Sequence, residues 1–134
     1  MYQIRGDVKN MKLKKCLNCG ALVEIVYDCT CKDGCLRCEC CGNDMVELKE
    51  NTVDCAVEKH KPIYEKVGDV VEVKVNHVME PEHYIEFIAL CSDKINQKVF
   101  LQPGELPIVK FPYVKGSKVY AYCNKHGLWS TEVI

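Results

Sequence analysis

A cysteine and a histidine three residues apart, Cys123 and His126, lie near the end of this 134-residue sequence. Thiolates and imidazoles both bind transition metals, and Gly127 permits a tight backbone turn beside them. The spacing therefore predicts a metal-binding loop. The same spacing also occurs in ordinary loops, so this interpretation depends on what the rest of the chain supplies.

The other three histidines of the chain lie in two further polar segments. His60 directly follows Glu58 and Lys59, while His77 and His83 flank a short loop. That loop can turn both imidazoles toward one point. A single histidine is usually an ordinary surface or core residue, but four histidines placed beside such motifs favour a shared function.

Eleven cysteines are the most informative feature of the composition. In a chain without a secretory signal, cysteines are more often metal ligands than disulfide partners, because a reducing cytosol keeps thiols free. Eight of them precede residue 42: Cys16, Cys19, Cys29, Cys31, Cys35, Cys38, Cys40 and Cys41. This asymmetry predicts two domains, a cysteine-rich one of residues 1–50 and one of residues 51–134.

The first domain contains two pairs of cysteines that can bind one ion. Cys16 and Cys19 form a CxxCG knuckle, and Cys40 and Cys41 are adjacent. Four thiolates make a tetrahedral site suited to iron or zinc. The ligand type leaves three alternatives open: a single iron as Fe(Cys)4, a four-iron, four-sulfur cluster (4Fe-4S), or structural zinc. A cluster would also draw on the loop cysteines Cys29, Cys31, Cys35 and Cys38.

Alternation of apolar and polar residues predicts short strands throughout the second domain. The strands are expected within residues 70–77, 83–91, 99–101, 107–111 and 118–123. Short strands at this spacing predict an all-β fold, an antiparallel β-sandwich. The alternation also places Ile85, Phe87 and Ala89 on one face of their strand. Residues 47–57 lack apolar periodicity and are expected to form a linker.

Charge and hydropathy exclude several classes of function. The net charge is -1 and lysines alternate with glutamates, whereas a nucleic-acid binder usually shows a basic patch. The sequence has no apolar run of about 18 residues and no apolar signal segment at its start. We therefore expect a cytoplasmic protein that binds neither nucleic acid nor a membrane.

Three motifs together carry a family resemblance. The segments Glu58–Pro62, His77–Ile85 and Cys123–Trp129 resemble superoxide reductase, and the cysteine pairs before them resemble the desulforedoxin module. Nearly the whole chain is therefore similar to a desulfoferrodoxin. The resemblance implies an immunoglobulin-like sandwich that binds one non-haem iron, and a small domain that binds a second. The implied ligands of the first iron are His60, His77, His83, His126 and Cys123, and those of the second are Cys16, Cys19, Cys40 and Cys41.

The resemblance also implies a reaction, the one-electron reduction of superoxide to hydrogen peroxide. Glu58 would occupy the sixth position of the ferric iron, and Lys59 would attract the anionic substrate. A rubredoxin-type protein would donate electrons to a homo-oligomer, a dimer or a tetramer. The chain departs from the family at Val78, where proline is common, and in its cysteine-rich loop of residues 29–38.

The chemistry of the site suggests two supporting roles. Backbone N–H groups of residues 124–127 are expected to donate to the Cys123 sulfur, and Trp129 is expected to shield the metal. Two rival functions are an electron-transfer iron-sulfur protein and a zinc-ribbon-like interaction module. An electron carrier does not need all four histidines, and a zinc module does not explain the second domain.

Overall fold

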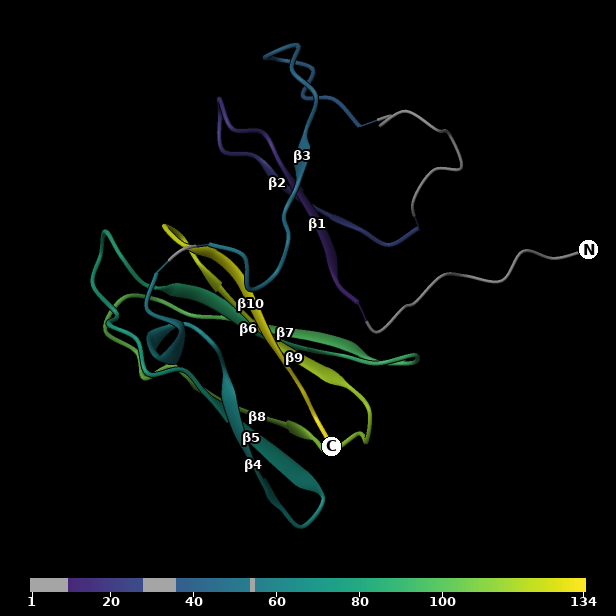
Figure 1. The fold of residues 1–134 in the computed structure, drawn as a ribbon, viewed down its shortest axis with the longest axis vertical. Coiled ribbons are helices and arrows are strands. Elements are labelled where there is room, and N and C mark those ends of the chain that lie inside the picture. The colour runs from purple at the N-terminus through teal and green to yellow at the C-terminus, as the bar shows by residue number, and fades with distance from the viewer. Residues whose placement is uncertain (1–9, 28–35, 54) are drawn as a thin grey trace, which may run out of the picture. The chain divides into compact units, whose positions relative to one another are not determined.

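The structure is a computed structural model that describes residues 10–27, 36–53 and 55–134. The described residues form two compact units: residues 11–27 with 36–48, and residue 10 with 49–134. Apart from one turn of 3-10 helix, η1 (Val57–Lys59), all their regular structure is strand, which confirms the all-β prediction (Figure 1). Within these described ranges, no helix is long and apolar enough to cross a membrane.

The first unit contains a small antiparallel sheet with the strand order β2-β1-β3. Its strands are β1 (Lys12–Lys15), β2 (Leu22–Ile25) and β3 (Val46–Glu47). Lys15 pairs with Leu22, so the segment that contains Cys16 and Cys19 forms the tip of the β1–β2 hairpin. So short a sheet buries little apolar surface, and a bound metal is a usual way to stabilise such a unit.

The second unit is an antiparallel β-sandwich, as the alternation predicts. One sheet has the order β10-β9-β6-β7 and the other the order β4-β5-β8 (Figure 1). The first sheet contains β6 (Ile85–Cys91), β7 (Asn96–Phe100), β9 (Lys118–Cys123) and β10 (Gly127–Glu132). The second contains β4 (Ile63–Val67), β5 (Val70–Lys74) and β8 (Ile108–Pro112).

Apolar side chains from both sheets form one core between the two layers. The cluster includes Val71 and Val73 from β5, and Ile88 and Leu90 from β6, all fully buried. Cys123, at the end of β9, is part of the same cluster and is also fully buried. The thiolate implied as an iron ligand therefore lies at the edge of the packed core.

A β-bulge near the start of β6 changes which side chains share a face. Ile85 pairs with Cys123 and Phe87 pairs with Tyr122, so the register shifts between Ile85 and Phe87. A bulge adds one residue to one strand and thereby reverses the alternation. The prediction that Ile85, Phe87 and Ala89 share one face is wrong, because Ile85 belongs to the core cluster whereas Phe87 stacks on Tyr122 on the opposite face.

The segment expected to be a linker is bound to β10 at Glu50 and Asn51. The N–H of Ser130 donates to Asn51 Oδ1 at 2.9 Å, and the N–H of Asn51 donates to the carbonyl of Leu128 at 2.9 Å. Glu50 accepts hydrogen bonds from Ser130 Oγ and from Lys118 Nζ. Polar composition suggested a linker, but here the polar groups pair with a strand edge that lies far away in the sequence.

Candidate metal centre

Five side chains predicted as iron ligands converge on one point of the second unit. One ligand atom from each of five residues lies within 4.8 Å of all the others: His60, His77, His83, Cys123 and His126. We call this group the histidine–cysteine site. Its members come from the end of η1, the loop after β5, the turn before β6, the end of β9 and the β9–β10 turn.

Distances within the site are those of atoms that share an ion. His60 Nε2 lies 3.0 Å from His126 Nδ1, and His83 Nε2 lies 3.2 Å from the same nitrogen. Metal–imidazole bonds of about 2.1 Å place two ligand atoms at right angles about 3 Å apart. Cys123 Sγ is 3.5 Å from His77 Nε2 and 3.8 Å from His126 Nδ1. The residues therefore fit a single transition-metal ion.

Backbone hydrogen bonds orient the first of these rings, His60. Its Nδ1 lies 2.7 Å from the carbonyl oxygen of Ala56, so Nδ1 carries the proton and donates it. The Nε2 lone pair is then free to bind a metal. The segment that carries His60 is bound to β10 on both sides. Before it, Asn51 accepts from the N–H of Ser130, and just after it, the carbonyl of Pro62 accepts from Thr131 Oγ1. His60 is itself buried.

The loop between β5 and β6 brings two imidazoles together. His83 and Glu80 exchange both backbone hydrogen bonds at 3.1 Å, which makes a tight turn. The ring of His83 lies 4.5 Å from that of His77, edge to face. His77 donates from Nδ1 to the carbonyl of Val78, which leaves its Nε2 for a metal. The loop that contains Val78 therefore holds both imidazoles in positions from which they can bind one ion.

Asn124 joins this loop to the turn that carries Cys123 and His126. Its side-chain Oδ1 accepts from the N–H of Tyr84 at 3.1 Å, and its Nδ2 donates to the carbonyl of Glu82 at 3.0 Å. Sequence reasoning missed this role, since an asparagine directly after a cysteine in a turn indicates only local backbone bonding. The backbone N–H of Asn124 donates to the carbonyl of Tyr84 at 3.3 Å, not to the Cys123 sulfur as expected.

Trp129 packs against the site from β10. Its ring lies 5.4 Å from that of His60, and its Nε1–H donates to the carbonyl of His126 at 3.0 Å. The side chain is almost fully buried. Trp129 therefore covers one ring and fixes the backbone that carries another, which extends the shielding role expected of it.

The electrostatics of the site favour the neutral form of two of its imidazoles, those of His77 and His126. Burial lowers the pKa of His77 below the ordinary histidine value, and the neighbouring rings lower it further, although the hydrogen bond to Val78 opposes them. Burial also lowers the pKa of His126, with His60 and His83 acting in the same direction. A neutral imidazole has the lone pair that a metal needs. Both rings therefore stay ready to bind as the pH falls toward the usual histidine pKa of about 6.5.

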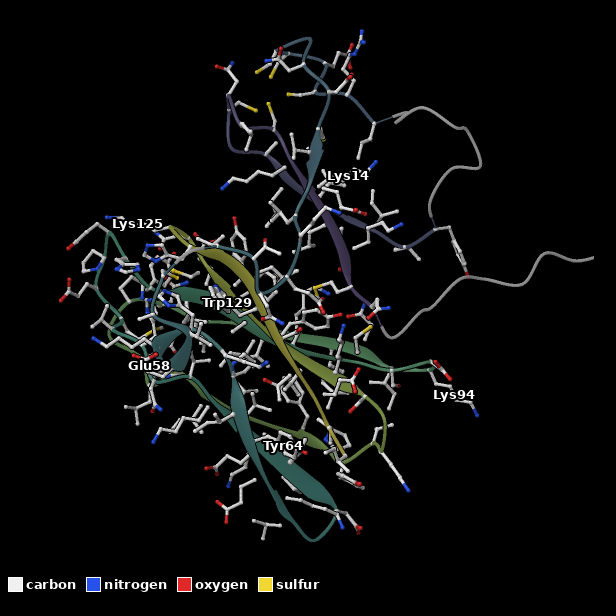
Figure 2. The ribbon with its side chains drawn as sticks, viewed as in Figure 1. Lys14, Glu58, Tyr64, Lys94, Lys125 and Trp129 are labelled. Carbon is white, nitrogen blue, oxygen red and sulfur yellow. The ribbon has the colours of Figure 1, made fainter. Side chains whose placement is uncertain are left out.

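Glu58 and Lys59 lie in η1, directly before His60, and both are exposed. Figure 2 labels Glu58 beside this turn and Lys94 at the opposite end of the second unit. Cys55, half-buried, lies with its Sγ 3.5 Å from His60 Nδ1. Both η1 residues are therefore exposed and adjacent in sequence to the buried His60.

A second group of ligands lies in the first unit. The sulfur atoms of Cys16, Cys19, Cys38 and Cys41 all lie within 4.8 Å of one another. Cys38 stands in this group, whereas the resemblance implied Cys40, whose Sγ lies 3.4 Å from that of Cys38. The alternative cluster ligands Cys29, Cys31 and Cys35 lie outside the described residues.

Fold and site together define a class, an antiparallel β-sandwich that presents four imidazoles and a buried thiolate to one metal ion. Comparison with known proteins gives the family. The family model described as Desulfoferrodoxin matches residues 52–132. The chain therefore belongs to the desulfoferrodoxin family.

Individual relatives agree with this assignment. A desulfoferrodoxin from Syntrophotalea carbinolica is 41% identical over 128 residues, which cover 92% of this chain and 98% of that protein. A superoxide reductase from Pyrococcus abyssi is 35% identical over 99 residues, 57% of this chain and 86% of that one. The crystal structure of the superoxide reductase from Treponema pallidum matches with a TM-score of 0.66 and 32% identity, covering 89% and 98% of the two chains.

Replacing Asn124 by alanine should weaken metal binding at the histidine–cysteine site. The change removes both side-chain hydrogen bonds that hold the Glu82–Tyr84 segment and thereby frees His83. Loss of such a partner typically costs about tenfold or more in affinity. Competition with a chelator, followed through the visible absorption of the oxidised site, measures this loss. Asn96→Ala is the matched control because Asn96 pairs with Cys91, at the far end of β6; equal affinities in the two variants would contradict the role.

Proposed function

We propose that this protein is a superoxide reductase that acts at a mononuclear non-haem iron in the histidine–cysteine site. The observation that carries the proposal is the convergence of five ligand atoms, four nitrogens and one sulfur, within 4.8 Å. Five donors leave one position of a six-coordinate ion open, and an open position distinguishes a catalytic metal from a structural one. Similarity to the superoxide reductases from Pyrococcus abyssi and Treponema pallidum supports the same activity.

Burial of the ligands indicates which side of the metal is open. Cys123 is fully buried in the sandwich core, whereas His77, His83 and His126 are only half-buried. The thiolate would therefore hold an ion from the interior, and these three imidazoles would hold it near the solvent. Superoxide is small and anionic, and a shallow position of this kind suits it.

The reaction balances with one electron and two protons. Superoxide accepts one electron and two protons and becomes hydrogen peroxide, and bound ferrous iron would supply the electron. The Cys123 thiolate would hold the iron from the buried side and donate electron density to it. Solvent reaches the half-buried imidazoles and provides the protons. An external protein must then return one electron, and we propose a rubredoxin-type donor.

Two exposed residues of η1 have proposed roles. Lys59 attracts the anionic substrate, because a cation beside an open metal position raises the local concentration of anions. Glu58 would serve as a further ligand to an oxidised iron at this site and so help to release the product. Both residues directly precede a ligand, His60, and both are exposed to solvent, which supports these roles.

We further propose that the four-cysteine group binds a second metal. We also propose that the protein is a homo-oligomer, either a dimer or a tetramer, and that it works in the cytoplasm. The four converging sulfur atoms support the second metal. None of the eight described cysteines forms a disulfide, which suits a reducing compartment. An electron carrier or a zinc ribbon would use only the four-cysteine group and would leave the histidine–cysteine site without a purpose.

The stoichiometry of the reaction tests the proposal. Pulsed superoxide and an excess of reduced rubredoxin should yield one hydrogen peroxide for each superoxide consumed, with one electron drawn from the donor and no oxygen evolved. A dismutase would instead release one oxygen and one peroxide for every two superoxide ions and would draw nothing from the donor. Peroxide and oxygen are measured together, against a sample without protein.

Lys59→Ala should slow the reaction with superoxide about threefold to tenfold, since one steering charge is lost. The dependence of the rate on ionic strength should flatten at the same time, because screening then has less attraction to remove. Pulse radiolysis measures both quantities. Lys94→Ala is the control, an exposed lysine in the β6–β7 turn at the other end of the unit (Figure 2). A Lys59 variant that behaves like the Lys94 variant would remove the steering role.

A further inference from the structure

Two CxxCG segments of the first unit have the same backbone hydrogen bonds. In the first, the N–H of Gly20 donates to the carbonyl of Cys16 at 2.8 Å, and the N–H of Cys16 donates to Ala21 at 2.9 Å. In the second, residues 38–43, the N–H of Gly42 donates to the carbonyl of Cys38 at 2.7 Å, and the N–H of Cys38 donates to Asn43 at 2.9 Å. The second segment is therefore a knuckle that starts at Cys38.

Backbone angles repeat in the two knuckles as well. Gly20 has a φ of +83° and Gly42 a φ of +70°, values at which side chains are strained. Each knuckle also lies at the tip of a short antiparallel pairing, Lys15 with Leu22 and Arg37 with Asp44. The correspondence makes Cys38 equivalent to Cys16, and Cys41 equivalent to Cys19.

In this correspondence Cys40 is equivalent to Asn18, which cannot be a thiolate ligand. Asn18 donates from Nδ2 to the sulfur of Cys41 at 3.2 Å, as a neighbour that stabilises a thiolate does. Cys40 and the proposed ligand Cys19 are exposed, whereas Cys38 and Cys16 are buried. Its sulfur lies 3.4 Å from that of Cys38 and 3.5 Å from that of Cys41. Cys40 therefore lies beside the ligand group on its solvent side.

Sulfur spacing indicates what the group can hold. A metal–sulfur bond of about 2.3 Å separates the sulfurs of a tetrahedral site by roughly 3.8 Å. The Cys19 and Cys38 sulfurs are 3.5 Å apart, and all four lie within 4.8 Å. A four-iron cluster binds each thiolate to a different iron and spreads the sulfurs more widely. Figure 2 shows the sulfur atoms of this unit gathered beyond one end of its strands.

We propose that a single ion, iron or zinc, binds to Cys16, Cys19, Cys38 and Cys41, and that Cys40 is a free thiol beside it. The two knuckles supply two thiolates each, with a two-residue spacing on both sides. The desulforedoxin resemblance implied the adjacent pair Cys40 and Cys41 instead, but the repeated hydrogen bonds of the two knuckles and the grouping of the sulfur atoms favour Cys38 over Cys40. The proposal concerns only the first unit and does not depend on the proposed activity of the second.

Metal content of two serine variants tests the ligand set. The full-length chain with both sites loaded should contain two metal ions, measured as iron plus zinc per chain. Cys38→Ser should lose about one of them, and the matched variant Cys40→Ser should keep both. Loss of an ion from Cys40→Ser, or retention of both by Cys38→Ser, would overturn the proposal. Loss of an ion when Cys29, Cys31 and Cys35 are together replaced by serine would also overturn it.

A second measurement needs no variant and so does not depend on whether Cys38→Ser folds. Iodoacetamide should alkylate Cys40 in the metal-loaded chain without releasing metal, while Cys16, Cys19, Cys38 and Cys41 react only after a chelator is added. Mass spectrometry of peptides locates the label. Protection of Cys40 in the loaded chain, or release of the ion as Cys40 reacts, would show that it is a ligand and would contradict the proposal.

Discussion

The histidine–cysteine site depends on the pairing of β9 with β6. Cys123 is the last residue of β9 and pairs with Ile85, the first residue of β6. Because Ile85 follows His83 by two residues, this pairing fixes the thiolate in the core close to the segment that carries His83. The bulge that follows Ile85 keeps this residue on the core side. Bulges commonly redirect side chains next to active sites. The sulfur lies on a strand, whereas the imidazoles lie on loops. The loop conformations therefore decide whether the imidazoles reach the sulfur.

Each loop is brought there by hydrogen bonds to a strand or to another loop. Asn51 and Thr131 hold the two flanks of the segment that contains His60, and Asn124 holds the segment before β6. Backbone carbonyls take the second nitrogen of His60 and of His77, which leaves the opposite nitrogen for the ion. These bonds restrict ring rotation before a metal arrives. A site built in this way pays little conformational entropy on binding.

The sequence predicted most strands and the metal-binding motifs. It did not predict the bulge in β6 or the long-range hydrogen bonds that hold the loops of the site. Alternation located the strands from β5 to β9, but it did not predict β4 and β10. The β4 segment, Ile63–Val67, contains charged residues, and the β10 segment, Gly127–Glu132, begins inside a motif that is typical of a loop. The bulge could not be predicted, since one extra residue leaves no mark in the composition. The partners of Asn51 and Asn124 lie about 80 and 40 residues away, so local patterns do not contain them. In the first unit, the resemblance implied the adjacent pair Cys40 and Cys41, whereas the sulfur group contains Cys38, which begins a second CxxCG knuckle.

Anomalous scattering from crystals of the iron-loaded protein tests the central claim most directly. Data collected just above and just below the iron absorption edge locate iron and distinguish it from zinc. We predict an iron peak about 2.1 Å from His60 Nε2, His77 Nε2, His83 Nε2 and His126 Nδ1, and about 2.3 Å from Cys123 Sγ. A loaded crystal without iron at this point, or an iron there that lacks the Cys123 sulfur as a ligand, would contradict the account.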